Sequence, residues 1–503
     1  MTVRDLLLAR AEDDRPALLW REAGQVRSLS WREYVAAAVR LAGELDRRLD
    51  PGLPPHVGVL LPNGPAFALH LAAAGLGGHV LVGLNTTRRG AALDADIAKA
   101  ECQLVVDSPD LALAAAGGAH DAALPNAVPS PDTLFMLIFT SGTSGSPKAV
   151  RVTHEKITGP GTHLVGRLGL TPGDVHYVSM PMFHSNAVMA GWAPALTTGA
   201  TFAVAGFSAR RFLPDVREFG ATYANYVGKP LTYVLATPEQ PDDVENPLRL
   251  VFGNEANEAD IAAFATRFGC EVVDSYSSTE NAVIVQRRPD MPHGSLGMPL
   301  PGVAVLSPDS GDLTADAVFD DSGRLLNPDE AIGELVNTTG AGAFAGYYRD
   351  DAAEVERMRG GMYWSGDLAY RDADGWVYFA GRSGEWLRVD GENLAAAPIE
   401  RILLRHPAIA EAAVYAVPDP KVGDQVACAL ILRAPLTPTE LEDFLAEQTD
   451  LSPKAWPRHV RIVDALPRTA TNKVLKRELT AAGVAPADDA RVWVRAERGT
   501  SYA

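Results

Sequence analysis

The chain has 503 residues, which is long enough for two or more domains because a single hydrophobic core stops growing well below this length. Its formal net charge of −18 argues against nonspecific nucleic-acid binding, and no apolar run reaches the roughly 18 residues that a membrane span needs. Its three cysteines lie far apart and form neither a metal-binding spacing nor a disulfide framework, so we expect a reducing, cytoplasmic setting.

Strand-like apolar runs alternate with helix-like stretches over the first 380 residues. The first of them predict strands at 57–61, 79–84 and 103–107 and helices at 66–76 and 91–99. This rhythm indicates an α/β fold with largely parallel, covered sheets. The Ala/Pro/Gly-rich residues 117–131 that follow are predicted to form a loop.

A loop of small residues comes next, between two predicted strands. The apolar run Leu134–Thr140 precedes it, and Ala149–Thr153 alternates like a second strand. Glycines let successive backbone N–H groups point at one anion, while hydroxyls add donors and a lysine adds a cation. The predicted phosphate contacts are Thr140, Ser141, Gly142, Thr143, Ser144, Gly145 and Lys148. A Walker A loop is excluded because Pro147 precedes the lysine and a strand follows it, whereas a simple hairpin turn stays open.

The string TSGTSGSPK at Thr140–Lys148 closely resembles the signature of the adenylate-forming superfamily, which includes acyl-CoA synthetases, luciferases and peptide-synthetase adenylation domains. This resemblance implies a large N-terminal domain of mixed, largely parallel sheets with helices and a smaller, mobile C-terminal α+β domain. The sequence departs from the family at Ala149, where a glycine is usual. A methyl group there is expected to cost little within a strand.

The segment Asp274–Glu280 (DSYSSTE) resembles the family's Tyr-Gly-x-Thr-Glu element at a strand end. The resemblance implies that Tyr276 stacks on adenine, that Thr279 contacts phosphate and that Glu280 helps to hold Mg²⁺, a hard cation suited to a carboxylate. Ser277 stands where the family has glycine. Upstream, the segment 253–255 resembles the family's adenine-contacting turn in a form similar to that of the bile-acid and very-long-chain acyl-CoA synthetases. The remaining predicted ATP contacts here are Gly253, Asn254, Glu255, Asp274, Ser275 and Ser277.

Asp367, in a Ser-Gly-Asp element, resembles the carboxylate that accepts hydrogen bonds from both ribose hydroxyls in the family. Arg382, after a predicted hairpin at 374–379, is the second expected ribose or phosphate contact. A domain boundary is predicted directly after it. Residues 1–383 would form the acid- and ATP-binding domain, and residues 384–503 a mobile lid with helices at 398–405 and 437–449 and a strand at 411–417.

Three further residues are assigned roles by the resemblance. Lys473, in the string LPRTATNKVLK, matches the family's catalytic lysine, although Asn472 replaces the usual glycine before it. Gly384 is expected to act as the hinge of the lid, and Gly391 to lie in the segment that swings inward for the CoA step. His184, in a Pro-x-Phe-His segment, is expected to line or gate the acyl site.

The resemblance as a whole implies an acyl-CoA ligase that uses Mg·ATP to form an acyl-adenylate and then transfers the acyl group to CoA. The alternatives are a ligase that loads a carrier protein, an enzyme that mainly runs the thioester step on acyl-AMP, and an inactive acid- or nucleotide-binding protein. The expected partners are a small carboxylic acid, ATP and CoA, and a homodimer is left open. The sequence does not identify the acid, although the branch resemblance suggests a long or polycyclic one.

Overall fold

The computed structural model describes residues 1–118, 123–140, 147–256, 258–288, 290–321, 323, 325–382, 386–389, 392–419, 423–468, 474–484, 491–495 and 499–502. The chain forms two compact units, one from residues 1–281 and 343–355 and the other from residues 282–342 and 356–503. The predicted hinge residue Gly384 is outside the described residues, and the boundary after residue 383 stays a prediction. No helix in the described ranges is both long enough and apolar enough to cross a membrane.

The first unit contains two mostly parallel sheets. The larger has the order β12-β11-β10-β8-β9-β1-β2, and only β2 runs antiparallel to its neighbour. Its strands are β1 (Pro16–Glu22), β2 (Gln25–Ser30), β8 (Val175–Val178), β9 (Thr201–Val204), β10 (Tyr223–Val227), β11 (Leu250–Asn254) and β12 (Glu271–Tyr276). The smaller has the order β5-β3-β4-β6-β7, with β7 antiparallel. Its strands are β3 (His56–Val59), β4 (Val80–Gly83), β5 (Leu104–Val106), β6 (Leu134–Thr140) and β7 (Lys148–Thr153).

The helices of this unit cover both sheets. They are α1 (Val3–Leu8), α2 (Trp31–Asp46), α3 (Pro65–Gly77), α4 (Gly90–Lys99), α5 (Asp110–Gly117), α6 (His154–Leu168), the π-helix η1 (Asn186–Trp192), α7 (Ala193–Thr198), α8 (Phe212–Phe219), α9 (Pro230–Leu235) and α10 (Glu258–Phe268). α12 (Asp351–Arg357) carries the chain from the first unit into the second. The elements predicted between residues 57 and 107 are all present, with ends shifted by one or two residues, and β6 matches its prediction.

Helix α3 shows why the local sequence was informative. It is apolar all round and almost wholly buried, as expected for a helix inside a large core. Pro65 occupies its first turn, where a missing N–H costs nothing, and Gly78 ends it in the left-handed conformation at φ 75°. The apolar run at 67–82 is therefore a buried helix followed by strand β4, as predicted.

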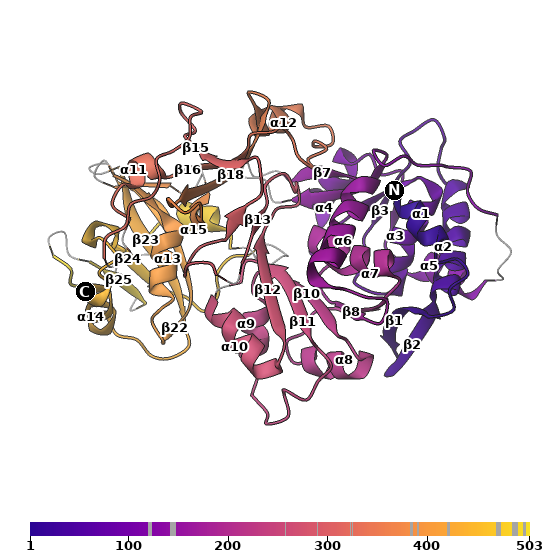
Figure 1. Cartoon of the computed structure of the whole chain (residues 1–503), viewed down its shortest axis with the longest axis horizontal. Coiled ribbons are helices and arrows are strands. Elements are labelled where there is room, and N and C mark those ends of the chain that lie inside the picture. The colour runs from indigo at the N-terminus through magenta and orange to yellow at the C-terminus, as the bar shows by residue number, and fades with distance from the viewer. Residues whose placement is uncertain are drawn as a thin grey trace. The chain divides into compact units, whose positions relative to one another are not determined.

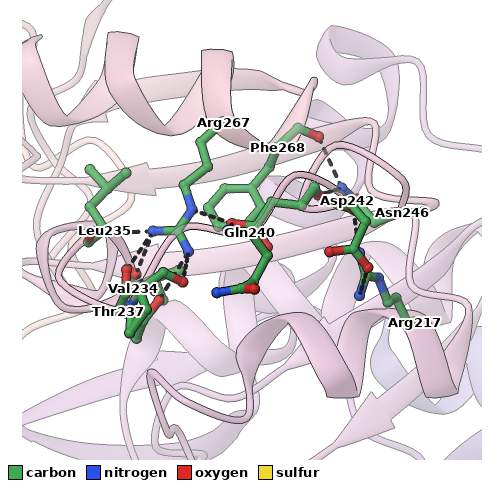
Figure 2. Close-up of polar contacts among 11 residues, drawn as sticks. Arg217, Val234, Leu235, Thr237, Gln240, Asp242, Asn246, Arg267 and Phe268 are labelled. Atoms are coloured by element: carbon green, nitrogen blue, oxygen red, sulfur yellow. Dashed lines mark hydrogen bonds and ion pairs between the residues drawn. The ribbon is translucent and has the colours of Figure 1, made fainter.

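One buried arginine fixes the connection between α9 and β11. Arg267, near the end of α10, has 8% of its side chain exposed and pairs with Asp243 at 2.6 Å. The same guanidinium donates to backbone carbonyl oxygens that end α9 and begin the connection, those of Val234, Leu235 and Thr237 (Figure 2). One guanidinium therefore donates hydrogen bonds to several backbone carbonyl groups, which fixes the conformation of this loop. The strand that follows the loop, β11, pairs with β10 and β12 (Figure 1).

The second unit is mainly antiparallel. One sheet has the order β15-β16-β18-β17, with β19 on β18, and the other has the order β21-β20-β23-β24-β25, with β22 on β23. The strands are β13 (Val285–Gln286), β14 (Met298–Pro299), β15 (Val303–Leu306), β16 (Gly333–Asn337), β17 (Met358–Arg359), β18 (Met362–Arg371), β19 (Val377–Arg382), β20 (Trp386–Val389), β21 (Glu392–Ala395), β22 (Ile409–Asp419), β23 (Gly423–Leu432), β24 (His459–Ile462) and β25 (Val492–Val494). The helices are α11 (Pro328–Ala331), α13 (Ala396–Leu403), α14 (Pro438–Glu447), the short η3 (Pro453–Ala455) and α15 (Lys476–Ala482).

The sheets are thus mixed, as the resemblance implied, and the largely parallel part ends at β12. The predicted hairpin at 374–379 is the tight connection between β18 and β19. The C-terminal predictions are confirmed as α13, β22 and α14, each within about two residues of its expected ends.

Candidate active site

The hairpin β6–β7 places Thr140 and Lys148 opposite each other. They are the last paired residues before the loop, and the Thr140 hydroxyl donates to the Lys148 carbonyl at 3.5 Å. The predicted strands on both sides of the loop are confirmed, whereas its residues 141–146 lie outside the described ranges. Lys148 is only 4% exposed, so its ammonium is held in the unit's interior rather than in solvent.

A short extended segment around Tyr347 joins the edge of this hairpin. Arg151 N donates to Gly346 O at 3.0 Å, and Tyr348 N donates to Ala149 O at 2.8 Å. The ring of Tyr347 therefore lies beside Lys148, whose Nζ is 5.3 Å from the ring centroid, within the range of a cation–π interaction. Ala149 is fully buried in β7, so its methyl group is accommodated in the strand, as expected.

The Tyr347 hydroxyl connects this hairpin to Glu280, the predicted metal-binding carboxylate. It donates to Glu280 Oε1 at 2.9 Å. Tyr347 thus contacts two predicted site residues at once, the cation Lys148 through its ring face and the carboxylate Glu280 through its hydroxyl. Sequence reasoning missed Tyr347, because nothing in its local pattern distinguishes it from a core aromatic residue.

Thr279 and the turn that carries His184 also come together. The hydroxyls of Ser185 and Thr279 are hydrogen-bonded at 2.9 Å. The next residue, Asn186, donates to the Tyr226 carbonyl at 2.8 Å and accepts from Asn225 Nδ2 at 2.6 Å. Buried amide groups therefore fix the turn containing His184 against the end of β10 and close to Thr279.

The predicted adenine contacts gather at the carboxyl ends of β10, β11 and β12, which is where open parallel sheets bind ligands (Figure 1). The Tyr226 hydroxyl donates to Asp274 Oδ2 at 2.6 Å, and Ala256 N donates to the same oxygen at 3.1 Å. Gly253 and Asn254 belong to β11 rather than to a turn, because both still pair with neighbouring strands, and the turn begins at Glu255 with a φ of 69°.

Asn254 and the start of the segment after β12 are held together by side-chain contacts. Asn254 Nδ2 donates to the Ser275 carbonyl, and the Ser277 hydroxyl donates to Asn281 Oδ1 at 3.0 Å. Ser275 is buried, while Tyr276 and Ser277 are half-buried. The serine at 277 therefore serves as a local hydrogen-bond donor at the position where the family has glycine.

The second unit holds the predicted ribose contacts. Asp367 in β18 pairs across the ladder with Arg382 in β19, and Arg382 Nε lies 3.4 Å from Asp367 Oδ1. Ser365 Oγ accepts from Asp367 N at 3.1 Å and helps to orient that residue. The structure therefore brings these two predicted residues together. Lys473, Gly384 and Gly391 lie outside the described residues, and their assigned roles stay predictions.

A buried lysine in the first unit was also missed. Lys156, in the first turn of α6, is 3% exposed, and its pKa is lowered to about 8 by burial, an effect that Glu280 partly opposes. The sequence around it, His-Glu-Lys, reads as a polar helix start and gives no sign of such burial.

Comparison with known proteins identifies the class to which this fold and site belong. The model of the AMP-binding enzyme family matches residues 8–348, and the model of the AMP-binding enzyme C-terminal domain matches residues 398–473. The chain belongs to the AMP-binding enzyme family. Within that family it is an ATP-dependent acid–thiol ligase of the AMP-forming kind, which activates a carboxylic acid and joins it to CoA.

Two curated relatives and one solved structure illustrate the similarity. The medium/long-chain-fatty-acid–CoA ligase FadD17 of Mycobacterium tuberculosis is 51% identical and aligns over 98% of both chains. The steroid-22-oyl-CoA synthetase of Rhodococcus jostii is 45% identical over 95% of this chain and 90% of its own length. The crystal structure of ATP-bound MatB from Rhodopseudomonas palustris has a TM-score of 0.81 at 24% identity, covers 96% of this chain and 99% of its own, and supports the fold alone.

Proposed function

We propose that the acid activated by this chain is a medium- or long-chain aliphatic acid. The observation that carries this proposal is the 51% identity, over almost the whole length, to a ligase named for such acids.

In the first half-reaction, an oxygen of the substrate carboxylate attacks the α-phosphorus of ATP and pyrophosphate leaves. The protein contributes by positioning the reactants and by stabilising the charge that develops on phosphate. We assign Lys148 and the hydroxyls of Thr140 and Thr279 as donors to the phosphates. Residues 141–145, in the loop between Thr140 and Lys148, are assigned the same role. Lys473 is assigned to the bridge between carboxylate and phosphate, and Asp367 with Arg382 to the ribose.

The donor set around Glu280 fits Mg²⁺ carried chiefly by nucleotide oxygens. Tyr347 orients the Glu280 carboxylate, and the described residues contain no cluster of three or more His, Cys, Asp or Glu side chains that could form a cage of protein ligands. A divalent ion that takes one carboxylate and completes its shell with phosphates and water is typical of Mg²⁺ sites. When bound, the ion would supply charge neutralisation on the triphosphate.

In the second half-reaction, the CoA thiolate attacks the acyl carbon of the acyl-adenylate, the thioester bond forms and AMP leaves. We assign the exchange between the two half-reactions to rotation of residues 384–503 about Gly384, which would withdraw Lys473 and bring Gly391 toward the reaction site. The same proposal includes a cytoplasmic setting, consistent with three free cysteines. The homodimer is still left open.

A steroid side-chain acid is the second candidate substrate, favoured by the 45% identity to the steroid-22-oyl-CoA synthetase. The deciding experiment incubates the purified chain with ATP, Mg²⁺, CoA and a panel of straight-chain and steroid side-chain acids, and measures AMP and acyl-CoA by mass spectrometry. We expect the highest kcat/KM with a straight-chain acid. A preference for the steroid acid would overturn the aliphatic proposal in favour of the second candidate.

The same assay, extended to measure pyrophosphate and acyl-adenylate and repeated with supplied acyl-AMP, separates the remaining alternatives. A chain that loads a carrier protein would form acyl-adenylate and pyrophosphate but little AMP and little acyl-CoA. An enzyme limited to the thioester step, as the departures at Ala149 and Asn472 would allow, would use supplied acyl-AMP but release no pyrophosphate from acid and ATP. An inactive binding protein would do neither.

A further inference from the structure

Lys99, the last residue of α4, joins two segments that carry predicted or newly found site residues. Its Nζ donates to the Pro147 carbonyl oxygen at 3.2 Å and pairs with Asp350 Oδ2 at 2.6 Å. Pro147 directly precedes Lys148, the lysine assigned to the phosphates, and Asp350 lies three residues after Tyr347. One ammonium therefore contacts both the start of β7 and the segment that carries Tyr347.

The segment around Tyr347 is attached to β7 by its backbone, through the hydrogen bonds between residues 346–348 and residues 149–151. Beyond it, Arg349 has a φ of 50°, a left-handed conformation that costs free energy for a residue other than glycine. Such a conformation persists only where the surrounding contacts hold it. The ion pair that Lys99 makes with Asp350, the next residue, is one of these contacts.

The contact between Lys99 and Asp350 is shielded from most of the solvent. The two side chains are 25% and 24% exposed, so water competes with the ion pair less than it does on an open surface. Asp350 is also held from its other side, because its Oδ1 accepts a hydrogen bond from Ala353 N at 3.3 Å in the first turn of α12. The contact thus links the end of α4, the start of β7 and the start of α12.

We propose that Lys99 is a positioning residue for the triphosphate of ATP. By holding Pro147 and Asp350 together, it keeps the Lys148 ammonium and the Tyr347 ring, which are 5.3 Å apart, in the arrangement that receives the phosphates. The proposal rests on the proposed function, in which Lys148 is a donor to the phosphates. Lys99 acts through the two segments that it joins rather than on the nucleotide itself.

The test uses isothermal titration calorimetry on the full chain with Mg²⁺ and two ligands, AMP and the ATP analogue with a methylene bridge between its α- and β-phosphates. AMP offers one phosphate and the analogue offers three, so a displaced Lys148 should weaken binding of the analogue more. We expect Lys99→Met to bind the analogue about 3- to 10-fold more weakly, the effect of one partly exposed ion pair with its hydrogen bonds, and to change AMP binding by less than about twofold. Lys99→Arg keeps a cation with several donors and should restore most of the affinity.

A variant of the partner separates geometry from long-range charge. Lys99→Met removes a positive charge, which by itself would weaken binding of a polyanion. Asp350→Asn breaks the same contact but removes a negative charge, so the electric field alone would strengthen binding. Its amide oxygen can still accept from Ala353 N, which places the amide nitrogen toward the ammonium. Positioning therefore predicts that both variants bind the analogue more weakly than the unaltered chain.

Arg217→Met is the matched control, because Arg217 makes the same kinds of contact at a loop with no assigned role. It pairs with Asp242 at 3.2 Å and donates to the Glu245 carbonyl oxygen at 3.1 Å. Its substitution should leave the affinity for both ligands as it is in the unaltered chain.

Three results would overturn the proposal. They are an unchanged affinity for the analogue in Lys99→Met, an equal loss for AMP and the analogue in that variant, and an affinity in Asp350→Asn that equals or exceeds that of the unaltered chain. If Lys99→Met does not fold, Asp350→Asn decides the outcome, because only positioning predicts weaker binding there.

Lys148→Met in the same titration tests the phosphate assignment itself. An unchanged affinity for the analogue would refute that assignment and the proposal with it, whereas a loss in Lys148→Met without one in Lys99→Met refutes the proposal alone. Because the titration needs neither acid nor turnover, failure of the acid panel leaves its result intact.

Discussion

Replacing Tyr347 with phenylalanine is the sharpest test of the site's geometry. Tyr347→Phe removes only the hydroxyl that donates to Glu280 Oε1 at 2.9 Å and keeps the ring face near Lys148. Glu280 then loses one fixed donor and becomes free to adopt other rotamers. We expect the affinity for Mg·ATP to fall, because the carboxylate must be ordered again when the metal and nucleotide bind.

The expected fall in affinity for Mg·ATP follows from the type of hydrogen bond that Tyr347→Phe removes. A hydrogen bond to a charged group contributes about 1.5–3 kcal/mol when it is fully buried. Glu280 is half-buried, so water can replace part of the lost interaction, and about 1–1.5 kcal/mol should remain. That corresponds to a fall of about 5- to 12-fold in kcat/KM for Mg·ATP.

The assay follows pyrophosphate release at saturating acid while Mg·ATP is varied. Tyr348→Phe is the matched control, because it makes the same change at the next residue, whose hydroxyl contacts Glu101 instead. Tyr347→Leu should lose more than Tyr347→Phe, by about 1 kcal/mol, since it also removes the ring face beside Lys148. The reasoning is refuted if Tyr347→Phe stays within about twofold of the Tyr348→Phe control.

Three further outcomes are expected. In Gly253→Ala the new Cβ would lie 2.4 Å from the Tyr226 carbonyl oxygen, so the free energy of unfolding should fall by about 1–3 kcal/mol and ATP binding should weaken. Thermal unfolding should therefore occur at a lower temperature, and an unchanged melting temperature would contradict this. Burial lowers the pKa of His154 and of His176 to about 4, below the unfolded value near 6.5. The free energy of unfolding, measured in urea, should therefore be highest above pH 6.5 and fall toward pH 4, by up to about 1.4 kcal/mol per pH unit for each histidine. A free energy of unfolding that stays constant over this pH range would be inconsistent with burial of the two histidines. Lys473→Ala should abolish pyrophosphate release from acid and ATP yet retain thioester formation from supplied acyl-AMP, and equal loss of both would remove its assigned role.

The elements that the sequence predicted well depend on neighbours in the chain. The loop after Thr140 was expected to join two strands, and β6 and β7 are present on either side of it as an antiparallel pair. Helix α3 was expected because glycines interrupt a long apolar stretch, and glycine is a local signal for where a helix ends. Asp367 and Arg382 were each expected to contact the nucleotide, and the hairpin predicted between them is the connection that pairs them across β18 and β19.

The sequence alone determined the order of the motifs, the alternation of strands and helices, and hence the family and its chemistry. Only the tertiary structure showed that Tyr347 contacts both Lys148 and Glu280, and that Lys156 in the first turn of α6 is buried. The physical reason is that a turn, a cap or an amphipathic period is set by residues a few positions apart. The surroundings of a side chain, by contrast, are set by which distant strands and helices pack around it, and no local pattern records that.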